Sequence, residues 1–539
     1  MPTLNWIGKE AVVNHHHQVP FHLLKDVPDL ACGQPGGGNL IVQGDNLVAL
    51  KALLPYYAGQ VKCIYIDPPY NTGNEGWAYN DNVNSPVIRE WLGKVVGKEG
   101  ETLDRHDRWL CMMYPRLALL RQFLREDGAI FISLDDNEIQ ALRYVMDEIF
   151  GSDNFVATII WQKVYAPKNS AKHFSEDHDF IVVYAKNAEK WRPRLVSRGD
   201  KQDKAYKNPD SDLRGLWRAD GMSARNAYSE GLYSVTTPSG RVIPGPPKGR
   251  YWVYSETKYR EMDADNRIWW GKDGNNAPAV KRFLTEVKQG VVPQTLWPYD
   301  EVGHTQEGKK ELVSIIDFAD SESVFITPKP ARLIERILQV STSPGDLVLD
   351  SFAGSGTTGH ATLKLNQTAP DKEPRRFILV EMGSKIAREI TAERVRRVAQ
   401  GYKNAKGEKI EGLGGGFRYC ELGEPLFDES GKIRETVSFA DLARHVYFTE
   451  TGEPLPRERV TKSPFIGECR GVGIYLLFNG ILVDKSAQGG NVLTRSVLAK
   501  LPKFDGQKVI YCAGCLLGKD RLQAERILVR QTPYEIKVS

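Results

Sequence analysis

Short apolar runs that end in a polar or acidic residue recur along the chain and predict buried strands. Four of them are Leu40–Val42, Val61–Ile66, Leu347–Leu349 and Phe377–Val380. Leucines at helical spacing predict an amphipathic helix over Leu47–Tyr56, directly after the first run. Strands that alternate with helices indicate a globular α/β protein with a sheet at its centre.

The tetrapeptide Asp67-Pro68-Pro69-Tyr70 follows the second run, so it lies at the carboxyl end of a strand. Proline has no N–H, so the turn after Asp67 offers carbonyl oxygens only. A carboxylate with carbonyl acceptors can hold an exocyclic amine, and an aromatic ring can stack on the base that bears it. This equipment suits chemistry on the amino group of a nucleobase rotated out of the helix. A rigid turn is the plainer alternative for two prolines after a strand.

A glycine-containing loop follows the third run. Asp350 closes that strand, and Ser351–Thr358 reads Ser-Phe-Ala-Gly-Ser-Gly-Thr-Thr. The glycines let the backbone approach a ligand closely, and the predicted helix Thr357–Leu365 offers free N–H groups at its start. The loop is neither a Walker A motif nor the full dinucleotide fingerprint, and by itself it is usually only a turn.

Two further acids stand at predicted strand ends. Glu381 follows Phe377–Val380, where a carboxylate suits ribose hydroxyls. Asp45 follows Leu40–Val42. Taken singly, Glu381 could be a solvated loop carboxylate and Asp45 a helix cap. Together with the glycine loop they predict a nucleoside-binding half-sheet.

These motifs resemble the amino-group DNA methyltransferases that use S-adenosylmethionine. In that family a Phe-x-Gly-x-Gly loop binds the cofactor, and an Asp/Asn/Ser-Pro-Pro-aromatic loop catalyses. The catalytic loop comes first here, as in the group called beta, a circular permutation of the usual fold. Asp67–Gly73, Phe131–Glu138 and Gly271–Asn276 resemble the modification (Mod) subunits of type III restriction–modification systems. The resemblance spans residues 35–400.

The resemblance implies a Rossmann-like methyltransferase sheet and a role for each motif residue. Gly128–Leu134 would be the fifth strand of that sheet and Phe180–Tyr184 a later one. Asp45 would face the cofactor's adenine, and Thr327–Pro330, with the helix Ala331–Val340, would pass beside its methionine moiety. The implied catalytic residues are Asp67, Pro68, Pro69 and Tyr70, and the implied cofactor-binding residues are Asp45, Lys329, Pro330, Asp350, Phe352, Ala353, Gly354, Ser355, Gly356 and Glu381.

The implied activity is transfer of a methyl group from S-adenosylmethionine to the N6 amino group of adenine in duplex DNA, by base flipping. Cytosine-N4 methylation is the nearest alternative, because an Asp at position 67 favours adenine in this family whereas Ser favours cytosine. Cytosine-C5 methylation needs a nucleophilic cysteine, usually after proline, and no Pro-Cys pair occurs. A related motif methylates protein glutamines or RNA bases. A non-catalytic specificity subunit is disfavoured by the intact motif residues.

Composition narrows the setting. The net charge is only +4, so an enzyme that acts on DNA must concentrate its positive charge on one face. Seven scattered cysteines fit a reducing compartment, and no apolar run approaches the length of a membrane span. We therefore expect a cytoplasmic protein. Cys512 and Cys515 form one pair without the further ligands that zinc needs, so no metal site is predicted.

A chain of 539 residues should form two to four domains. Residues 191–325 hold six of the eleven tryptophans among scattered arginines and lysines, a mixture that suits contacts with phosphates and bases. A small β-rich core is the plainer explanation for those tryptophans. The predicted parts are an N-terminal arm (1–34), a catalytic half (35–190), a target recognition domain (191–325), a cofactor-binding half (326–402) and a small α+β C-terminal domain (403–539).

The last part offers two local signals and no motif. Gly412–Gly416 reads as a linker, and Ile474–Phe478 with Ile481–Val483 reads as a hairpin turning at Asn479-Gly480. Dimerisation, partner docking and simple stabilisation are equally open for it. The expected partners are duplex DNA, a second copy of the chain, and a Res-like helicase–endonuclease subunit. An enzyme without that subunit is the alternative. The chain has no Walker A motif, so it is not itself the ATP-driven translocating endonuclease.

Overall fold

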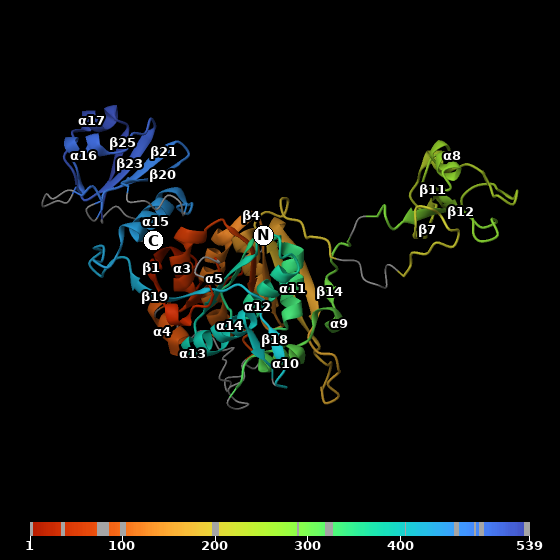
Figure 1. Cartoon of the computed structure of the whole chain (residues 1–539), viewed down its shortest axis with the longest axis horizontal. Coiled ribbons are helices and arrows are strands. Elements are labelled where there is room, and N and C mark those ends of the chain that lie inside the picture. The colour runs from red at the N-terminus through yellow and green to blue at the C-terminus, as the bar shows by residue number, and fades with distance from the viewer. Residues whose placement is uncertain are drawn as a thin grey trace. The chain divides into compact units, whose positions relative to one another are not determined.

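The chain folds into two compact units, which are described separately. The first comprises Met1–Arg194 with Gln294–Ser539, and the second is Leu195–Pro293 (Figure 1). The computed structural model describes residues 4–33, 38–72, 86–96, 104–196, 204–287, 290–318, 327–404, 406–456, 463–478, 481–483 and 490–532. Gly73 and the predicted turn Asn479-Gly480 lie outside the described residues.

A ten-stranded mixed sheet forms the centre of the first unit, in the order β1-β19-β2-β16-β15-β3-β4-β6-β5-β14. The strands from β19 to β4 run parallel, and β6 runs antiparallel between β4 and β5. In sheet order their bounds are His22–Asp26, Arg418–Pro425, Leu40–Gln43, Arg376–Glu381, Leu347–Asp350, Val61–Ile66, Leu124–Leu134, His178–Ala185, Phe155–Gln162 and Leu296–Trp297.

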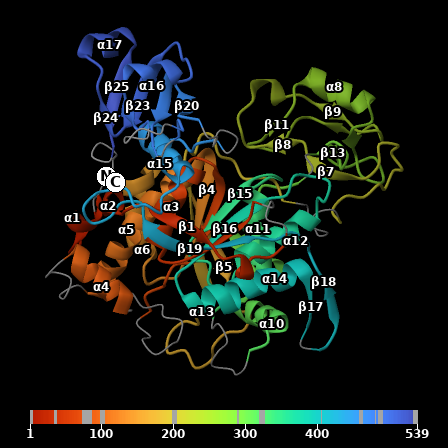
Figure 2. The same ribbon diagram turned by 60° about the vertical axis from the view of Figure 1, so that its left-hand side comes forward.

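Helices cover both faces of this sheet, which is why its central strands are almost wholly apolar. Side chains alternate between faces along a strand. In β16, Ile378 and Val380 join the core formed with α3 (Asn46–Tyr57), α5 (Arg105–Phe123) and α6 (Ile139–Phe150). Phe377 and Leu379 instead lie against Gly359 of α12 (Thr357–Gln367), which packs with α11 (Ala331–Ser341) and α14 (Glu393–Gln400) (Figure 2).

The central strands come from distant parts of the chain. β15 and β16 follow the second unit in sequence, yet they lie between β2 and β3, which precede it. This interleaving is the permuted arrangement predicted for the sheet, and the predicted α/β fold class is confirmed. No helix in the described ranges has both the length and the apolar character needed to cross a bilayer.

The predicted boundary between residues 402 and 403 separates β19 from the main sheet to which it belongs. β19 pairs in parallel with β2 and antiparallel with β1, so it covers the edge that β2 would otherwise expose. The residues read as a linker pack closely: a Cβ on Gly416 would lie 2.2 Å from the Cys32 carbonyl oxygen. The N-terminal arm likewise supplies β1 to the sheet. Residues 294–318, predicted to belong to the recognition domain, belong to the first unit.

The hairpin predicted around residue 480 is wrong. β21 (Val472–Leu476) pairs with the preceding strand β20 (Phe465–Cys469) on one side and with β23 (Gln507–Cys512) on the other. Both edges of β21 are therefore taken, and residues 481–483 form no strand. A fourth strand, β25 (Ile527–Gln531), and two short helices, α16 (Arg495–Lys500) and α17 (Lys519–Ala524), complete this small subdomain.

The second unit is a small β-rich fold. Its described residues contain a three-stranded sheet of β12 (Ile268–Trp269), β13 (Ala279–Phe283) and β7 (Trp217–Gly221), together with the helix α8 (Glu256–Ala264). Trp252 and Trp270 are buried in its core, so these two tryptophans are residues of a small β-rich core and are not available to contact DNA.

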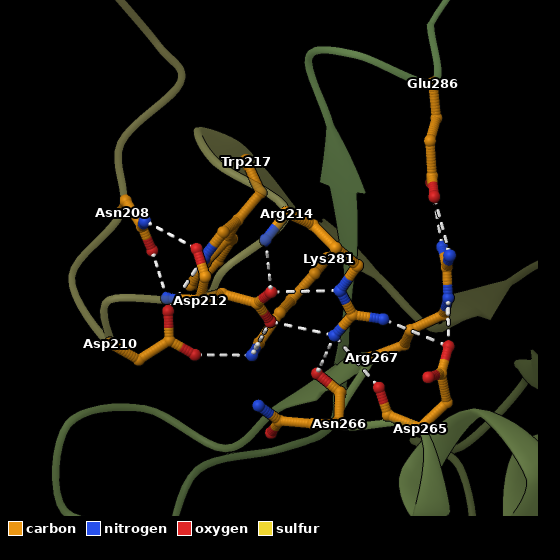
Figure 3. Close-up of polar contacts among 10 residues, drawn as sticks. All are labelled: Asn208, Asp210, Asp212, Arg214, Trp217, Asp265, Asn266, Arg267, Lys281 and Glu286. Carbon is orange, nitrogen blue, oxygen red and sulfur yellow. Dashed lines mark hydrogen bonds and ion pairs between the residues drawn. The ribbon is translucent and has the colours of Figure 1, made fainter.

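A polar network reinforces this fold (Figure 3). The buried ammonium of Lys281 pairs with Asp210 and with Asp212, the latter at 3.1 Å. Arg214 bonds to Asp212 at 2.8 Å and to Asp265 at 3.0 Å. These cations are therefore paired with acids of the unit itself.

The position of β19 predicts where the chain can be shortened. A chain that ends at residue 402 leaves β1 without a partner and β2 with an open edge, so we expect it to lose cooperative thermal unfolding. A chain that ends at residue 456 keeps β19 and α15 (Phe439–Thr451) and should retain that transition. Calorimetry and near-ultraviolet circular dichroism compare the two, and equal melting would show that β19 is dispensable.

Candidate functional site

The four acids predicted at strand ends lie along one edge of the main sheet. Asp45 follows β2, Glu381 ends β16, Asp350 ends β15 and Asp67 follows β3. These are four consecutive parallel strands, so their carboxyl ends share one edge. The fold thus brings the Asp67–Tyr70 loop and the glycine loop next to each other, although the whole second unit lies between them in sequence.

The Asp67–Tyr70 loop is held by contacts that sequence reasoning did not find. The Trp109 indole donates to the Pro69 carbonyl at 2.7 Å. Asn71 adopts a left-handed backbone with φ 58°, and its buried amide donates to the Arg105 carbonyl at 3.0 Å and to Glu138 at 2.5 Å. Trp109 and Arg105 belong to α5, and Glu138 is the N-cap of α6. The Pro69 carbonyl is thus engaged by the protein, and that of Pro68 is the acceptor that the amine hypothesis uses.

The carboxylate of Asp67 forms a close ion pair with Lys329. The Lys329 ammonium lies 2.7 Å from Oδ1 and 2.6 Å from Oδ2, and its side chain is only 9% exposed. Burial raises the pKa of Asp67 above its ordinary value, while the charge of Lys329 lowers it. Lys329 was predicted to bind cofactor, but its ammonium lies on the predicted catalytic acid. Its carbonyl accepts from Thr357 at 3.2 Å, beside the glycine loop.

Tyr70 lies next to a second acid–base pair. Its hydroxyl donates to Asp179 across 3.4 Å, and Asp179 is bound by Lys163 at 2.6 Å. The ring packs against the main core, with the Lys329 ammonium 5.0 Å from its centroid. These contacts fix the ring beside Asp67. Nothing in the single sequence distinguished Asp179 or Lys163 from ordinary strand residues.

Two carboxylates shape the glycine loop from within. Glu381 accepts from the Gly354 N–H at 2.9 Å and from the Gly383 N–H at 2.8 Å. Asp350 accepts from the Phe352 N–H at 3.0 Å and from the Thr358 hydroxyl at 2.5 Å. Burial raises the pKa of Asp350 to about 7, against these hydrogen bonds. Both carboxylates therefore support the loop structurally, whatever ligand they also contact.

Glycine is required at two points of this loop. Gly354 and Gly356 have φ of 48° and 75°, a left-handed backbone that side chains disfavour. Gly356 caps α12 without a side-chain oxygen, so the first N–H groups of that helix have no side-chain cap. The remaining residues of the loop are mostly buried. Ala353 bonds through its N–H to the Val380 carbonyl at 3.0 Å, and Phe352 packs against the core.

A buried arginine supports the loop from α14. Arg394 is 0% exposed, and its guanidinium donates to Ser355 Oγ at 3.1 Å and to Thr357 Oγ1 at 2.7 Å. It also bonds to Glu311 at 3.1 Å. The sequence predicts a basic helix here, but not which of its arginines turns inward.

Asp45 behaves as the helix cap that was the plainer alternative. One carboxylate oxygen accepts from the Leu47 and Val48 N–H groups at 2.9 and 3.2 Å, and the other pairs with Arg116 at 2.9 Å. Its contact with a cofactor stays a prediction. Pro330 begins α11 as its N-cap, next to Lys329.

Comparison with known proteins identifies the family. A family model described as DNA methylase matches residues 61–393, so the chain belongs to the DNA methylase family. It is 35% identical to the Type III restriction-modification enzyme StyLTI Mod subunit of Salmonella typhimurium strain LT2, over 67% of this chain and 57% of that protein.

Two other relatives extend this picture. The chain is 31% identical to the EcoPI Mod subunit of Escherichia phage P1, over 74% of the chain and 68% of the relative. It is 42% identical to the DNA adenine methyltransferase YhdJ of Escherichia coli K12, over 64% of the chain and 78% of the relative. The chain thus spans little more than half the length of the StyLTI Mod subunit.

The support that Arg394 gives to the glycine loop predicts an effect on cofactor affinity. Arg394→Met leaves the Ser355 and Thr357 hydroxyls without their buried donor, so S-adenosylmethionine should bind on the order of tenfold more weakly by calorimetry. Arg397→Met is the matched control, because Arg397 lies on the same helix but bonds to Glu393 and Asp317 at the surface. Equal affinity in both variants would show that Arg394 does not support cofactor binding.

Proposed function

We propose that the chain is a site-specific DNA methyltransferase that transfers a methyl group from S-adenosylmethionine to the N6 amino group of adenine in duplex DNA. One observation carries this proposal. The Asp67–Tyr70 loop after β3 and the glycine loop after β15 lie at the ends of adjacent parallel strands, so two substrates can meet between them. The names of the Mod subunits and of the adenine methyltransferase among its relatives support the same activity.

The residues at the glycine loop fit S-adenosylmethionine. The start of α12 presents backbone N–H groups, and the positive φ of Gly354 and Gly356 keeps side chains out of the approach. Glu381 accepts from the backbone N–H groups of Gly354, Met382 and Gly383, and the remaining capacity of its four lone-pair sites suits a ribose hydroxyl. Bound there, the cofactor supplies an electrophilic methyl group on a sulfonium. Asp45, Lys329, Pro330, Asp350, Phe352, Ala353 and Ser355 complete the proposed binding residues.

The task of Asp67 is to make the adenine amine nucleophilic. The lone pair of that amine is delocalised into the ring. Hydrogen bonds from the amine to the Asp67 carboxylate and the Pro68 carbonyl favour a pyramidal nitrogen whose lone pair points at the methyl group. They also stabilise the positive charge that develops on the nitrogen, a contribution of about 2–4 kcal/mol by analogy with single oxyanion-hole donors. The proton leaves to water after transfer, when the methylated amine is strongly acidic.

Tyr70 would receive the base. Its ring, fixed by the core and by Asp179, offers a face for stacking that offsets part of the few kcal/mol lost when the base leaves the helix. Holding both reactants in line supplies much of the remaining acceleration.

We place DNA recognition in the second unit. Arg214 and Lys281 are neutralised by acids of the unit (Figure 3). Among the other basic side chains of this unit, Arg218, Arg225, Arg241, Lys248 and Arg250 are exposed and form no ion pair with any residue in the described part of the chain. Such unpaired cations suit DNA phosphates.

The names of the Mod relatives support a place in a type III restriction–modification system. A Res-like subunit and a second copy of the chain are the partners that we propose. A chain with these partners and this substrate would work in the cytoplasm.

Sequencing of genomic DNA with modified-base detection tests the function. Hosts that express the chain should carry N6-methyladenine at one sequence motif, and hosts that express Asp67→Ala should lose the signal, because the charged amine acceptor is gone. In purified protein we expect the rate to fall by about 10²–10³ while S-adenosylmethionine still binds.

The matched control is Asp346→Ala, at the opposite end of β15, where the carboxylate pairs with Arg125. It should keep the methylation. Full methylation by Asp67→Ala would refute the assignment, and N4-methylcytosine in place of N6-methyladenine would move it to the cytosine alternative.

Substitution of Tyr70 separates stacking from hydrogen bonding. Tyr70→Ala removes the ring and should raise KM for DNA about tenfold, since base–aromatic stacking contributes ~1–3 kcal/mol. Tyr70→Phe keeps the ring and loses the hydroxyl with its contacts to Asp179, at 3.4 Å, and to Asp67, so it should stay closer to wild type than Tyr70→Ala. Steady-state kinetics on a duplex with the target motif checks this. Equal losses in both variants would contradict the stacking role.

A further inference from the structure

The Lys329 ammonium occupies the position that the target amine needs. It donates to both oxygens of Asp67, at 2.7 and 2.6 Å, and it lies 5.0 Å from the centroid of the Tyr70 ring. A flipped adenine would present its amine to the same carboxylate over the same ring. Lys329 and the substrate amine would therefore compete for the same place.

The charges around this pair indicate what it does before the substrates bind. Within the described ranges, Lys329 is the only ion-pair partner of Asp67. The other lysine nearby, Lys163, is paired with Asp179 at 2.6 Å. A half-buried carboxylate that loses its counter-ion tends to take up a proton. Protonated Asp67 would be a weaker acceptor for the amine. Lys329 thus keeps the acid ionised and ready.

The same pair has to open before the reaction. The ammonium lies against both oxygens of the carboxylate and over the Tyr70 ring, so it fills the space in which a base stacked on that ring would present its amine. An ammonium left in place would also stand beside a cationic sulfonium, and like charges at such range repel strongly. Methyl transfer therefore requires Lys329 to leave Asp67.

The side chain of Lys329 can leave Asp67, whereas its backbone is held in place. Its backbone lies between Pro328 and Pro330, and its carbonyl accepts from Thr357, the first residue of α12, at 3.2 Å. Lys329 therefore joins the two halves of the site, with its backbone at the cofactor loop and its ammonium on the catalytic loop.

We propose that Lys329 is a gate that holds Asp67 until S-adenosylmethionine binds, so that the cofactor enters before the target base. This inference rests on the proposed function. The sulfonium of the cofactor repels the ammonium, and the amino-acid carboxylate of the cofactor offers it a new partner. Release of Lys329 then exposes both oxygens of Asp67 to the amine.

Base capture without any chemistry tests the gate. A duplex with 2-aminopurine next to the target adenine reports flipping of that adenine by its fluorescence, with and without sinefungin, an analogue with a cationic amine in place of the methylsulfonium. The wild-type chain should capture the base at least tenfold better with sinefungin. Lys329→Met should capture it to the same extent, within about twofold, in both conditions.

Matched variants control for local damage. Lys163→Met removes the neighbouring lysine and should keep the dependence on sinefungin, and Lys329→Arg, which can still pair with Asp67, should keep it too. Thermal melting verifies folding, and Lys329→Gln replaces the Met variant if that one unfolds.

Two results would overturn the gate: a wild-type chain that captures the base equally without sinefungin, or a folded Lys329→Met or Lys329→Gln variant that still depends on it. Nucleoside mass spectrometry of the wild-type reaction separates these failures from a failure of the proposed function. Absence of methyladenine refutes the function, whereas methylation with an unchanged dependence in the variants refutes the gate alone.

Discussion

The parallel pairing of β3 with β15 is the constraint on which the site depends. Register places Val348 beside Cys63 and Leu349 beside Ile64, so the loops that follow the two strands emerge at the same edge. The pairing joins segments that lie on either side of the second unit in sequence. Any change that shifts this register would separate the Asp67–Tyr70 loop from the glycine loop, so the target base and the cofactor could no longer meet.

Around this pairing, buried polar side chains set the loop geometry. Trp109 fixes the Pro69 carbonyl, Arg394 fixes the hydroxyls of the glycine loop, and Glu381 ties that loop to the end of β16. Each satisfies backbone or hydroxyl groups that would otherwise be buried without partners, so each supports the site and the fold together. The pair of Lys329 with Asp67 differs, because it occupies the acceptor that the chemistry requires.

The sequence predicted local structure well and long-range pairing poorly. Apolar runs such as Val61–Ile66 marked the central strands, because burial on both faces leaves no room for polar residues. Strand-end acids and the glycine loop marked the site edge. The membership of β19 in the main sheet and the strand neighbours of β21 depend on contacts between distant segments, which leave no local pattern. For the same reason Arg394 and Asp179 could not be singled out, and the partner of Lys329 could not be foreseen.

The most direct measurement of the account is a structure of the chain with sinefungin and a duplex that contains its target motif. The account predicts the target adenine stacked on Tyr70, its amine nitrogen within hydrogen-bond distance of Asp67, and the Lys329 ammonium away from that carboxylate. An adenine bound elsewhere, with Lys329 still on Asp67, would contradict it.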